Sequence, residues 1–203
     1  MVTQAVQQYA RSGVAGLQIE DLVQTKRCGH LQSKQLVDTL TFISRIRAAK
    51  AARDSINSDI VIIARTDALQ SLGYKEAIQR LKAAQEAGAD VAFLEGITSK
   101  DEARAVVRDM APCPVLLNMV DGGTTPSISA AEAQEMGFRI IIFPLAGISP
   151  ALKAIKATYT KLKKEGVTGA EADMTPKQFT VCGLQDSLDI DAAACGSAYS
   201  NGV

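Results

Sequence analysis

The sequence has no long apolar run and no excess of charge of one sign. No apolar stretch in its 203 residues approaches the roughly 18 residues of a membrane-spanning helix, so we expect no such helix and no membrane partner. Lysine plus arginine and aspartate plus glutamate both number 22. A balanced charge gives no electrostatic reason to expect nucleic acid or an anionic surface as a partner. The basic stretch at 44–53 is interpreted as a solvated helix face.

Cysteine is scarce, and its spacing is irregular. The cysteines form neither a disulfide framework nor a CxxC pattern, and the first residues lack the pattern of a secretory signal peptide. We therefore expect free thiols in a reducing compartment. The expected location is the cytoplasm or the mitochondrial matrix, with no targeting segment visible in this chain. The four cysteines are Cys28, Cys113, Cys182 and Cys195.

The glycine motifs of nucleotide-binding folds are also absent: there is no GxGxxG and no Walker loop ending in Gly-Lys-Ser/Thr. The chain instead alternates short apolar runs with longer helical patterns. Runs that are almost continuously Val, Ile and Leu are typical of parallel strands buried on both faces under helices. The predicted strands are 14–19, 59–64, 91–94, 114–118 and 139–143. The predicted helices are 3–11, 36–56, 74–87, 100–110, 130–136 and 150–165.

The signals at helix ends support this alternation. Ser129, with Glu132 three residues later, predicts a capping box at the start of the helix at 130–136. Gly137 follows the end of the same helix, where a residue with left-handed backbone is favoured. Each helix then runs almost directly into the next strand, as expected for an array of βα units.

A polar residue or a proline closes each predicted strand, and groups converging from successive strand ends build the mouth of a barrel. These residues are Glu20, Arg65, Glu95, Asn118 and Pro144. We predict an α/β fold: a (β/α)8 TIM-type barrel that is N-terminally incomplete, since a whole barrel typically needs about 250 residues. About the last five strands are expected, with residues 1–169 in the barrel and 170–203 in a C-terminal helical tail. A doubly wound five-stranded sheet is the alternative.

The segment Lys26-Arg27-Cys28-Gly29-His30 combines a thiol with two cations and the only histidine of the chain. Nearby positive charge favours the thiolate, which is the reactive form of cysteine. The segment follows a predicted strand, and loops after strands carry the chemistry in parallel α/β folds. We therefore predict a catalytic loop, and the alternative is a surface loop that happens to be basic.

Four segments together resemble one known family. They are Gly-Leu-Gln-Ile-Glu-Asp at 16–21, Thr-Lys-Arg-Cys-Gly-His-Leu at 25–31, Ile-Ile-Ala-Arg-Thr-Asp-Ala at 62–68 and Ala-Phe-Leu-Glu-Gly at 92–96. The family they resemble is the isocitrate lyase/phosphoenolpyruvate mutase superfamily, in particular its 2-methylisocitrate lyase and oxaloacetate hydrolase-like branch. Mutases of the family usually lack the loop cysteine, so Cys28 argues against carbon–phosphorus chemistry.

The resemblance implies a carbon–carbon lyase that uses Mg²⁺, with Mn²⁺ as an alternative, on a small di- or tricarboxylic acid similar to 2-methylisocitrate. A hard divalent cation held by oxygen ligands stabilises the negative charge of an enolate while the bond breaks. By position, Glu20 matches the acidic residue at the metal site of the family.

The resemblance also assigns roles to other residues. Cys28 matches the cysteine that exchanges a proton with the enolate carbon, and Arg65 matches an arginine that binds a substrate carboxylate with its planar fork. The positions that match catalytic residues or their neighbours are Lys26, Cys28 and His30, and those that match substrate-binding residues are Gly29, Arg65, Glu95 and Asn118.

Some of these residues also have a structural interpretation. Arg65 fits an ion pair with Glu20 or Glu95. Glu95 fits a helix cap, and Asn118 fits a turn. Asp67 fits a turn or a partner of Arg65 better than a metal ligand.

One departure from the family pattern bears on activity. The main metal ligands of the family lie in a segment of the type Asp-Ala-Asp-Thr-Gly, which this sequence lacks. Leu22 also replaces the glutamine that usually follows Glu-Asp. We therefore expect this truncated chain by itself to have little or no activity. A non-catalytic paralogue that binds in a hetero-oligomer with a full-length homologue is one alternative.

A second alternative is hydrolysis of oxaloacetate to oxalate and acetate. The resemblance implies that the hydrolases tend to carry serine where the last strand ends, and this chain has Pro144 there. Proline cannot donate a hydrogen bond, so we rank hydrolysis second to lyase chemistry. The resemblance further implies a homotetramer, with the tail packed against a neighbouring subunit.

Overall fold

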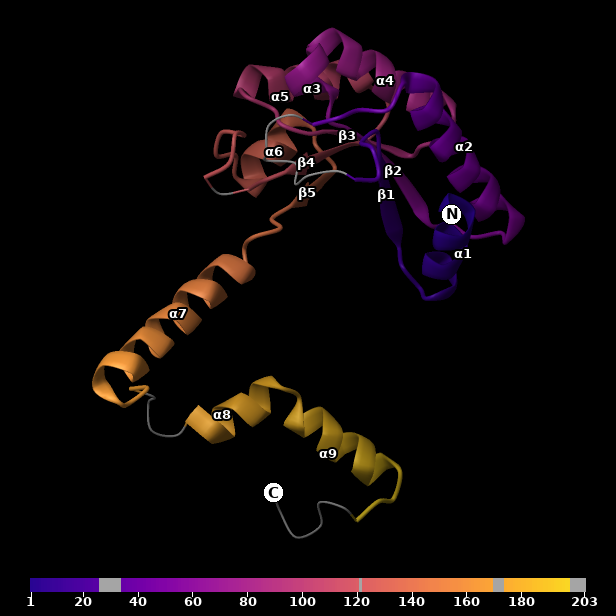
Figure 1. The fold of residues 1–203 in the computed structure, drawn as a ribbon. Helices are drawn as coiled ribbons and strands as arrows, with labels where there is room; N and C mark the ends of the chain where they lie inside the picture. Colours follow the sequence, from indigo (N-terminus) through magenta and orange to yellow (C-terminus); the bar gives the residue numbers. More distant parts are fainter. Residues whose placement is uncertain (26–33, 121, 170–173, 198–203) are drawn as a thin grey trace. The chain divides into compact units, whose positions relative to one another are not determined.

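The computed structural model describes residues 1–25, 34–120, 122–169 and 174–197 (Figure 1). The chain separates into two compact units, Met1–Gly147 and Ile148–Val203. The first unit carries the sheet and the residues predicted to form a site, whereas the second is helical where it is described. The predicted division into a barrel at 1–169 and a tail at 170–203 stays a prediction.

All five predicted strands are present, and they form one parallel sheet. Its order is β1-β2-β3-β4-β5, so each strand pairs with the next one along the chain. A doubly wound sheet reverses its order at a switch point, whereas a barrel adds strands in sequence. The fold is therefore a partial TIM-type barrel, as predicted. The strands are β1 (Gly16–Glu20), β2 (Val61–Thr66), β3 (Val91–Leu94), β4 (Val115–Asn118) and β5 (Ile140–Ile142).

Helices cover the outer face of this curved sheet (Figure 1). They are α1 (Val2–Arg11), α2 (Thr39–Ser55), α3 (Ala68–Leu72), α4 (Tyr74–Glu86), α5 (Lys100–Met110) and α6 (Ala130–Met136). The bounds of α5 and α6 agree with the prediction. The short helix α3 was not predicted, because the turn at its start is fixed by a contact with Asp21, which is distant in the sequence.

The predicted capping box of α6 is confirmed. The Ser129 hydroxyl accepts from the Glu132 backbone N–H, and the Glu132 carboxylate accepts from the Ser129 N–H. Gly137 ends the helix with a φ of 96°, the left-handed backbone that the sequence predicts. Two further caps, Asp38 on α2 and Ser99 on α5, also accept hydrogen bonds from the first turn of their helices. Local signals therefore fix where these helices begin.

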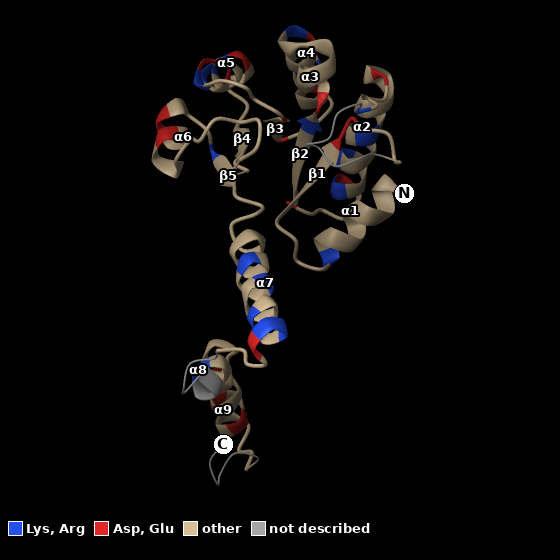
Figure 2. Cartoon of the chain, turned by 60° about the vertical axis from the view of Figure 1, so that its left-hand side comes forward, with Lys and Arg blue, Asp and Glu red and all other residues tan. Residues whose placement is uncertain are grey.

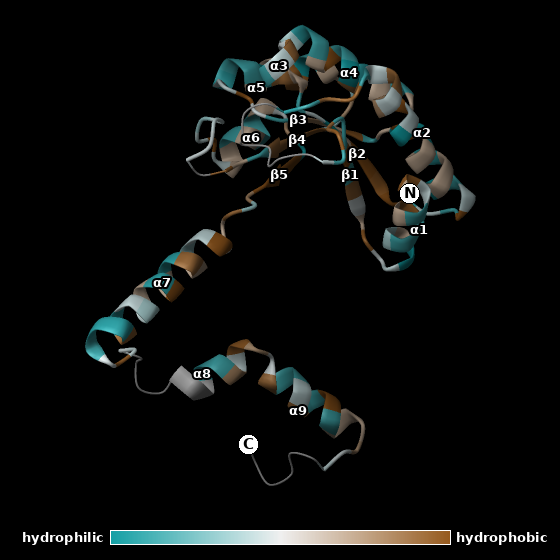
Figure 3. Ribbon diagram, in the orientation of Figure 1, coloured by the Kyte–Doolittle hydropathy of each residue, from teal (hydrophilic) through white to brown (hydrophobic). Residues whose placement is uncertain are grey.

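The two faces of the sheet differ in how they are covered. Side chains on its outer face, such as Ile62 and Leu117, are buried beneath the helices together with Phe42 and Ile46 of α2. Each such side chain stabilises the fold by about 1.5–3 kcal/mol. Figure 3 shows the strands as largely hydrophobic. Strand β3 is buried on both faces, as predicted, but no residue of β1 is fully buried, because β1 lies at one end of the strand order.

In the second unit, α7 (Ile148–Glu165) is amphipathic. Its apolar residues recur at intervals of four and three, so they form one stripe along the helix. This stripe consists of Ile148, Leu152, Ile155, Tyr159 and Leu162, all exposed. Figure 2 shows lysines along the rest of α7. The other helices of this unit are α8 (Met174–Val181) and α9 (Leu184–Ala193). Within the described ranges, no helix has the length and apolar character needed to cross a membrane.

Candidate active site

The strand register places the predicted site residues on one face of the sheet. Glu20 pairs with Arg65, and Arg65 pairs with Phe93. Because side chains alternate between the two faces of a strand, these three point to the same inner face. Glu95 and Asn118 occupy the same face at the ends of the next two strands, by the same alternation. The sequence predicted that Arg65 follows the strand. Arg65 instead lies inside β2, because the pairing of β2 with β1 and β3 continues to this residue.

Arg65 lies among three carboxylates. Its Nε and Nη2 atoms donate to the two carboxylate oxygens of Asp67 at 2.8 and 3.1 Å. Glu20 Oε2 is 3.5 Å from Nε, and Glu95 Oε2 is 3.7 Å from Nη2. The guanidinium also lies over the Phe93 ring, 5.1 Å from its centroid. Arg65 therefore forms the inter-strand ion pairs with Glu20 and Glu95 that the structural interpretation predicted. These ion pairs do not exclude a role in ligand binding.

These contacts change the protonation behaviour of Arg65 and Asp67. Burial acts to lower the pKa of Arg65, but the hydrogen bond to Asp67 and the nearby carboxylates outweigh it and the pKa is raised. Burial acts to raise the pKa of Asp67, but its bonds to Arg65 and Lys34 outweigh that effect and the pKa is lowered. Both groups therefore carry their charges at neutral pH.

Lys34 is a site residue that the sequence analysis missed. Its Nζ atom donates to Asp67 Oδ1 at 2.7 Å, and its side chain is only 5% exposed. Lys34 follows the predicted catalytic loop by a few residues, so its place in the sequence could have indicated a site residue. Nothing in the sequence indicated that it contacts Asp67. Asp67 now holds two cations, which makes it a structural centre of the site.

Glu95 and Asn118 contact each other at the ends of β3 and β4. Asn118 Nδ2 donates to Glu95 Oε2 at 3.3 Å, and Glu95 is 5% exposed. The interpretation of Glu95 as a helix cap is excluded, because the cap of α5 is Ser99. The Oδ1 atom of Asn118 is buried and has no hydrogen-bond partner within the described part of the chain. A buried acceptor without a donor is costly, so it marks a place where a ligand would gain a hydrogen bond.

Lys34, Glu95 and Asn118 line a cavity of about 410 Å³. In its lining, Lys34 supplies a cation, Glu95 and Asn118 supply a carboxylate and an amide, and Thr124 and Thr125 supply hydroxyls. A volume of this size and a mixed polar and apolar lining are typical of small-molecule sites. The cavity can therefore hold a small polar acid beside the strand ends.

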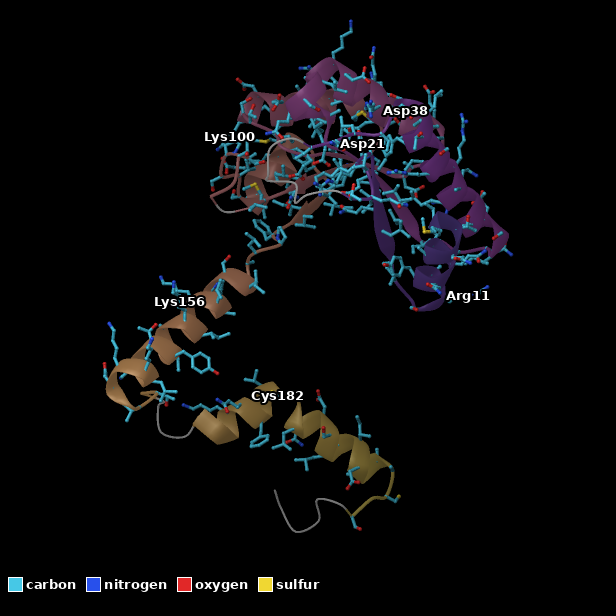
Figure 4. The ribbon with its side chains drawn as sticks, in the orientation of Figure 1. Arg11, Asp21, Asp38, Lys100, Lys156 and Cys182 are labelled. Atoms are coloured by element: carbon cyan, nitrogen blue, oxygen red, sulfur yellow. The ribbon has the colours of Figure 1, made fainter. Side chains whose placement is uncertain are left out.

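Asp21, the residue after the end of β1, is fully buried. Its side chain is labelled in Figure 4. Its carboxylate accepts from the Thr66 hydroxyl at 2.6 Å and from the Asp67 N–H at 2.9 Å. Burial is the largest influence on Asp21 and raises its pKa, although Thr66, the Asp67 N–H and Arg80 act in the opposite direction. Asp21 therefore fixes the turn that follows β2.

Several predicted site residues lie outside the described part of the chain, namely Lys26, Cys28, Gly29 and His30. The described chain on either side of them is well defined: Leu22 and Leu36 form an antiparallel bridge, and the Val37 N–H donates to the Asp21 carbonyl at 2.8 Å. Arg45 stabilises the segment that precedes these four residues, because its Nη1 atom donates to the carbonyls of Glu20 and Leu22. Arg45 is therefore not part of a solvated face, which corrects that interpretation of the stretch at 44–53.

The described residues offer few ligands for a metal ion. Among them, no group of three or more His, Cys, Asp or Glu side chains could hold a metal ion. Mg²⁺ needs near-octahedral oxygen geometry, and Glu20 offers one carboxylate that is close to Arg65. These residues by themselves do not fit a Mg²⁺ site. The role of Glu20 as a metal ligand stays a prediction, and the roles assigned to the other residues do not depend on it.

The strand order defines a TIM-type α/β protein, and the polar groups at its strand ends form the candidate site. Residues 1–163 match the family described as phosphoenolpyruvate phosphomutase, and the chain belongs to this family. The family resemblance predicted from the sequence is confirmed.

Two curated relatives are lyases. The chain is 38% identical to a 2,3-dimethylmalate lyase of Eubacterium barkeri over 94% of the chain and 66% of the relative. It is 37% identical to a 2-methylisocitrate lyase of Aeropyrum pernix over 88% of the chain and 56% of the relative. The chain thus spans less than two thirds of the length of these relatives.

Solved structures show the same fold. A crystal structure of 2,3-dimethylmalate lyase, a member of the PEP mutase/isocitrate lyase superfamily, matches with a TM-score of 0.97 and 59% identity, covering 100% of this chain and 68% of that one. A structure of oxaloacetate acetylhydrolase matches with a TM-score of 0.93 and 51% identity, covering 98% and 67%. The neighbours therefore include a lyase and a hydrolase.

Proposed function

We propose that this chain belongs to a carbon–carbon lyase that cleaves a small 2-hydroxy acid similar to 2-methylisocitrate. The substrates that two lyase relatives are named for share a carbon bearing a hydroxyl, a methyl and a carboxylate group. The observation that carries the proposal is the position of Arg65. It is bound to Asp67 and lies 3.7 Å from Glu95, which lines the cavity. The similarity of the chain to a 2,3-dimethylmalate lyase structure supports the same proposal.

The proposed reaction breaks the bond between the hydroxyl-bearing carbon and its neighbour. The hydroxyl passes its proton to a base, for which the Glu95 carboxylate beside Asn118 is the candidate among the described residues, and its carbon becomes the oxo carbon of pyruvate. The electron pair of the broken bond stays on the neighbouring carbon as an enolate. Cys28 then donates a proton to that carbon, which gives succinate from 2-methylisocitrate or propionate from 2,3-dimethylmalate.

The described residues bind and orient the acid in this proposal. Arg65 holds one carboxylate, because its guanidinium is fixed in advance and a planar fork matches a carboxylate. Asn118 uses its buried Oδ1 atom to accept from the substrate hydroxyl. Lys34 adds positive charge along the cavity, which favours a substrate with more than one carboxylate.

Hydrolysis of oxaloacetate is the second candidate, because an oxaloacetate acetylhydrolase structure is 51% identical to this chain. Pro144, two residues beyond the end of β5, argues for the lyase, since it offers no hydrogen-bond donor where we expect serine in a hydrolase. The two reactions give different products, so a single assay separates them.

The assay incubates the chain with 2-methylisocitrate, 2,3-dimethylmalate or oxaloacetate, and measures products by NMR. Each reaction is run with Mg²⁺, with Mn²⁺ and with EDTA, which tests the proposed cofactor. For a version of the chain joined to the N-terminal strands of a full-length relative, assayed beside the chain itself, we expect pyruvate with succinate or propionate, and a Cys28→Ser variant of that version should lose turnover by orders of magnitude. Cys113→Ser, at a buried thiol far from the strand ends, serves as the control.

Oxalate without pyruvate would overturn the lyase assignment in favour of the hydrolase. The same assay tests the expectation that the 203-residue chain alone turns over little substrate. Co-elution of the chain with a full-length homologue, together with no turnover by the chain itself, would support the alternative of a non-catalytic partner in a hetero-oligomer.

A further inference from the structure

Arg80 is a buried cation that the proposed function does not use. It lies on α4, and 6% of its surface is exposed. In the sequence it looks like an ordinary surface residue of a helix, four positions after Glu76. Burying a charge is costly unless it is fully paired, so the partners of Arg80 show what its position achieves.

Two of those partners lie outside α4. Arg80 Nη1 donates to Asp21 Oδ2 at 3.2 Å and to the Val37 carbonyl at 2.9 Å. Its Nε atom donates to Glu76 Oε1 at 3.0 Å within the helix. One side chain of α4 therefore reaches the segment after β1 and the segment before α2.

The bond to Asp21 continues toward the site. Asp21 Oδ1 accepts from the Asp67 N–H at 2.9 Å, which fixes the backbone of Asp67. The Asp67 carboxylate in turn accepts from Arg65 Nε at 2.8 Å. Arg80, Asp21, Asp67 and Arg65 thus form an unbroken chain of hydrogen bonds from α4 to the barrel mouth.

The bond to Val37 is connected to the Asp67 carboxylate through Lys34. The Val37 N–H donates to the Asp21 carbonyl, so Arg80 and Asp21 hold both polar groups of the Val37 backbone. Lys34 lies three residues before Val37 and binds Asp67 at 2.7 Å. Both cations that contact Asp67 are therefore carried by segments that Arg80 and Asp21 hold.

We propose that Arg80 is a positioning residue for the strand-end site, which acts through Asp21 and Asp67 to set the orientation of the Arg65 guanidinium. The proposal rests on the proposed function in one respect, namely that Arg65 binds a substrate carboxylate. A lysine cannot replace Arg80 in this role, because its single ammonium group does not reproduce the planar set of donors that binds Asp21, Val37 and Glu76 together.

The test measures the Arg65 side chain directly. In ¹⁵N-labelled protein, the Arg65 Nε–H signal is assigned by its loss in Arg65→Lys, and its exchange rate with water is measured. The bond to Asp67 protects this proton, so Arg80→Met should raise the rate about tenfold or more, equal to about 1.4 kcal/mol of lost protection. Arg80→Lys should raise it as well. The matched control is Arg104→Met, at an exposed arginine of α5, which should leave the rate unchanged.

A structural role alone would lower stability without changing Arg65. An unchanged Arg65 exchange rate in folded Arg80→Met would therefore overturn the proposal, and so would failure of both Arg80 variants to fold. Where the chain turns over 2-methylisocitrate, Arg80→Lys should raise KM about tenfold with kcat nearly constant. A wild-type chain without turnover would count against the proposed function, whereas the exchange measurement would still decide the role of Arg80.

Discussion

Arg65 is held in place by the protein before any ligand arrives. Its Nε and Nη2 atoms are bound to Asp67, and its flat face lies on Phe93. A group that is already ordered loses little conformational freedom on binding, so more of the interaction energy remains for affinity. The same contacts also leave only part of the guanidinium edge available, which limits how an acid can approach it.

Arg65→Lys should therefore weaken substrate binding more than it slows the chemical step. A lysine keeps the charge but loses the fork and the stacked geometry, and we expect KM to rise about tenfold or more. Steady-state kinetics with 2-methylisocitrate measure the change in the version of the chain that carries the N-terminal strands of a relative. Arg104→Lys, which alters an exposed arginine in the same way, should have kinetics like the wild type. A larger fall in kcat than rise in KM would contradict a binding role.

Some residues of the candidate site could be predicted from the sequence and others could not, for a physical reason. Arg65, Glu95 and Asn118 stand at the ends of apolar runs, so their position follows from the strand pattern alone. The roles of Lys34 and Arg80 depend on contacts with Asp67 and Asp21, which lie 33 and 59 positions away along the chain. Local patterns carry no information about such contacts.

At the scale of helices and strands, local signals are most informative at helix ends. The capping box of α6 was predicted from Ser129 and Glu132 alone, and Lys100 of α5 adds an ion pair to Glu132. The helix α3 shows the opposite case, since the buried carboxylate of Asp21 holds the turn before it. Elements whose ends are fixed by neighbouring residues can be predicted, and those fixed by distant residues cannot.

The α6 cap gives a prediction about pH. The hydrogen bond from Lys100 and the bonds with Ser129 lower the pKa of Glu132 from its ordinary value of 4.5 to about 2. A lowered carboxyl pKa adds stability that is fully present above the unfolded value and is lost as the pH falls through the folded value. Glu132→Gln should therefore lower the melting temperature at pH 7, and its difference from the wild type should shrink between about pH 4.5 and 2.

Two comparisons make this measurement specific. Ser129→Ala removes the other half of the capping box and should cost about 1 kcal/mol, measured by urea unfolding. Glu135→Gln changes a carboxylate on the same helix that is outside the box, and its effect should be small. A Glu132→Gln effect that stays constant down to pH 2 would contradict the assigned pKa.

At the scale of the whole molecule, α7 is notable because the apolar side of this helix is exposed. Its apolar stripe, from Ile148 to Leu162, is between 39% and 67% exposed. Exposed apolar stripes of this length usually mark a contact with another protein surface. The tail beyond it continues as α8 and α9, which contain exposed Phe179, Val181 and Ile190. These surfaces support the proposal, drawn from the family resemblance, that the chain forms a homotetramer.

Removal of residues 170–203 should therefore reduce the molecular mass measured by light scattering, because apolar contacts with a neighbouring subunit are lost. The control is removal of residues 198–203 alone, which keeps α8 and α9. We expect the control to retain the mass of the intact assembly. An unchanged mass after the larger deletion would exclude the tail as an assembly element.

The sequential order of the five strands has a consequence for how the chain folds. Each strand after β1 pairs with the strand that precedes it in the sequence. One helix lies between the two strands in each case, except between β2 and β3, where α3 and α4 lie. Contact order in this sheet is therefore set by the length of one βα unit and not by the length of the chain. As synthesis proceeds from the N-terminus, β2 finds β1 already available, and each later strand likewise meets its partner as soon as it emerges. The sheet can consequently grow vectorially during translation.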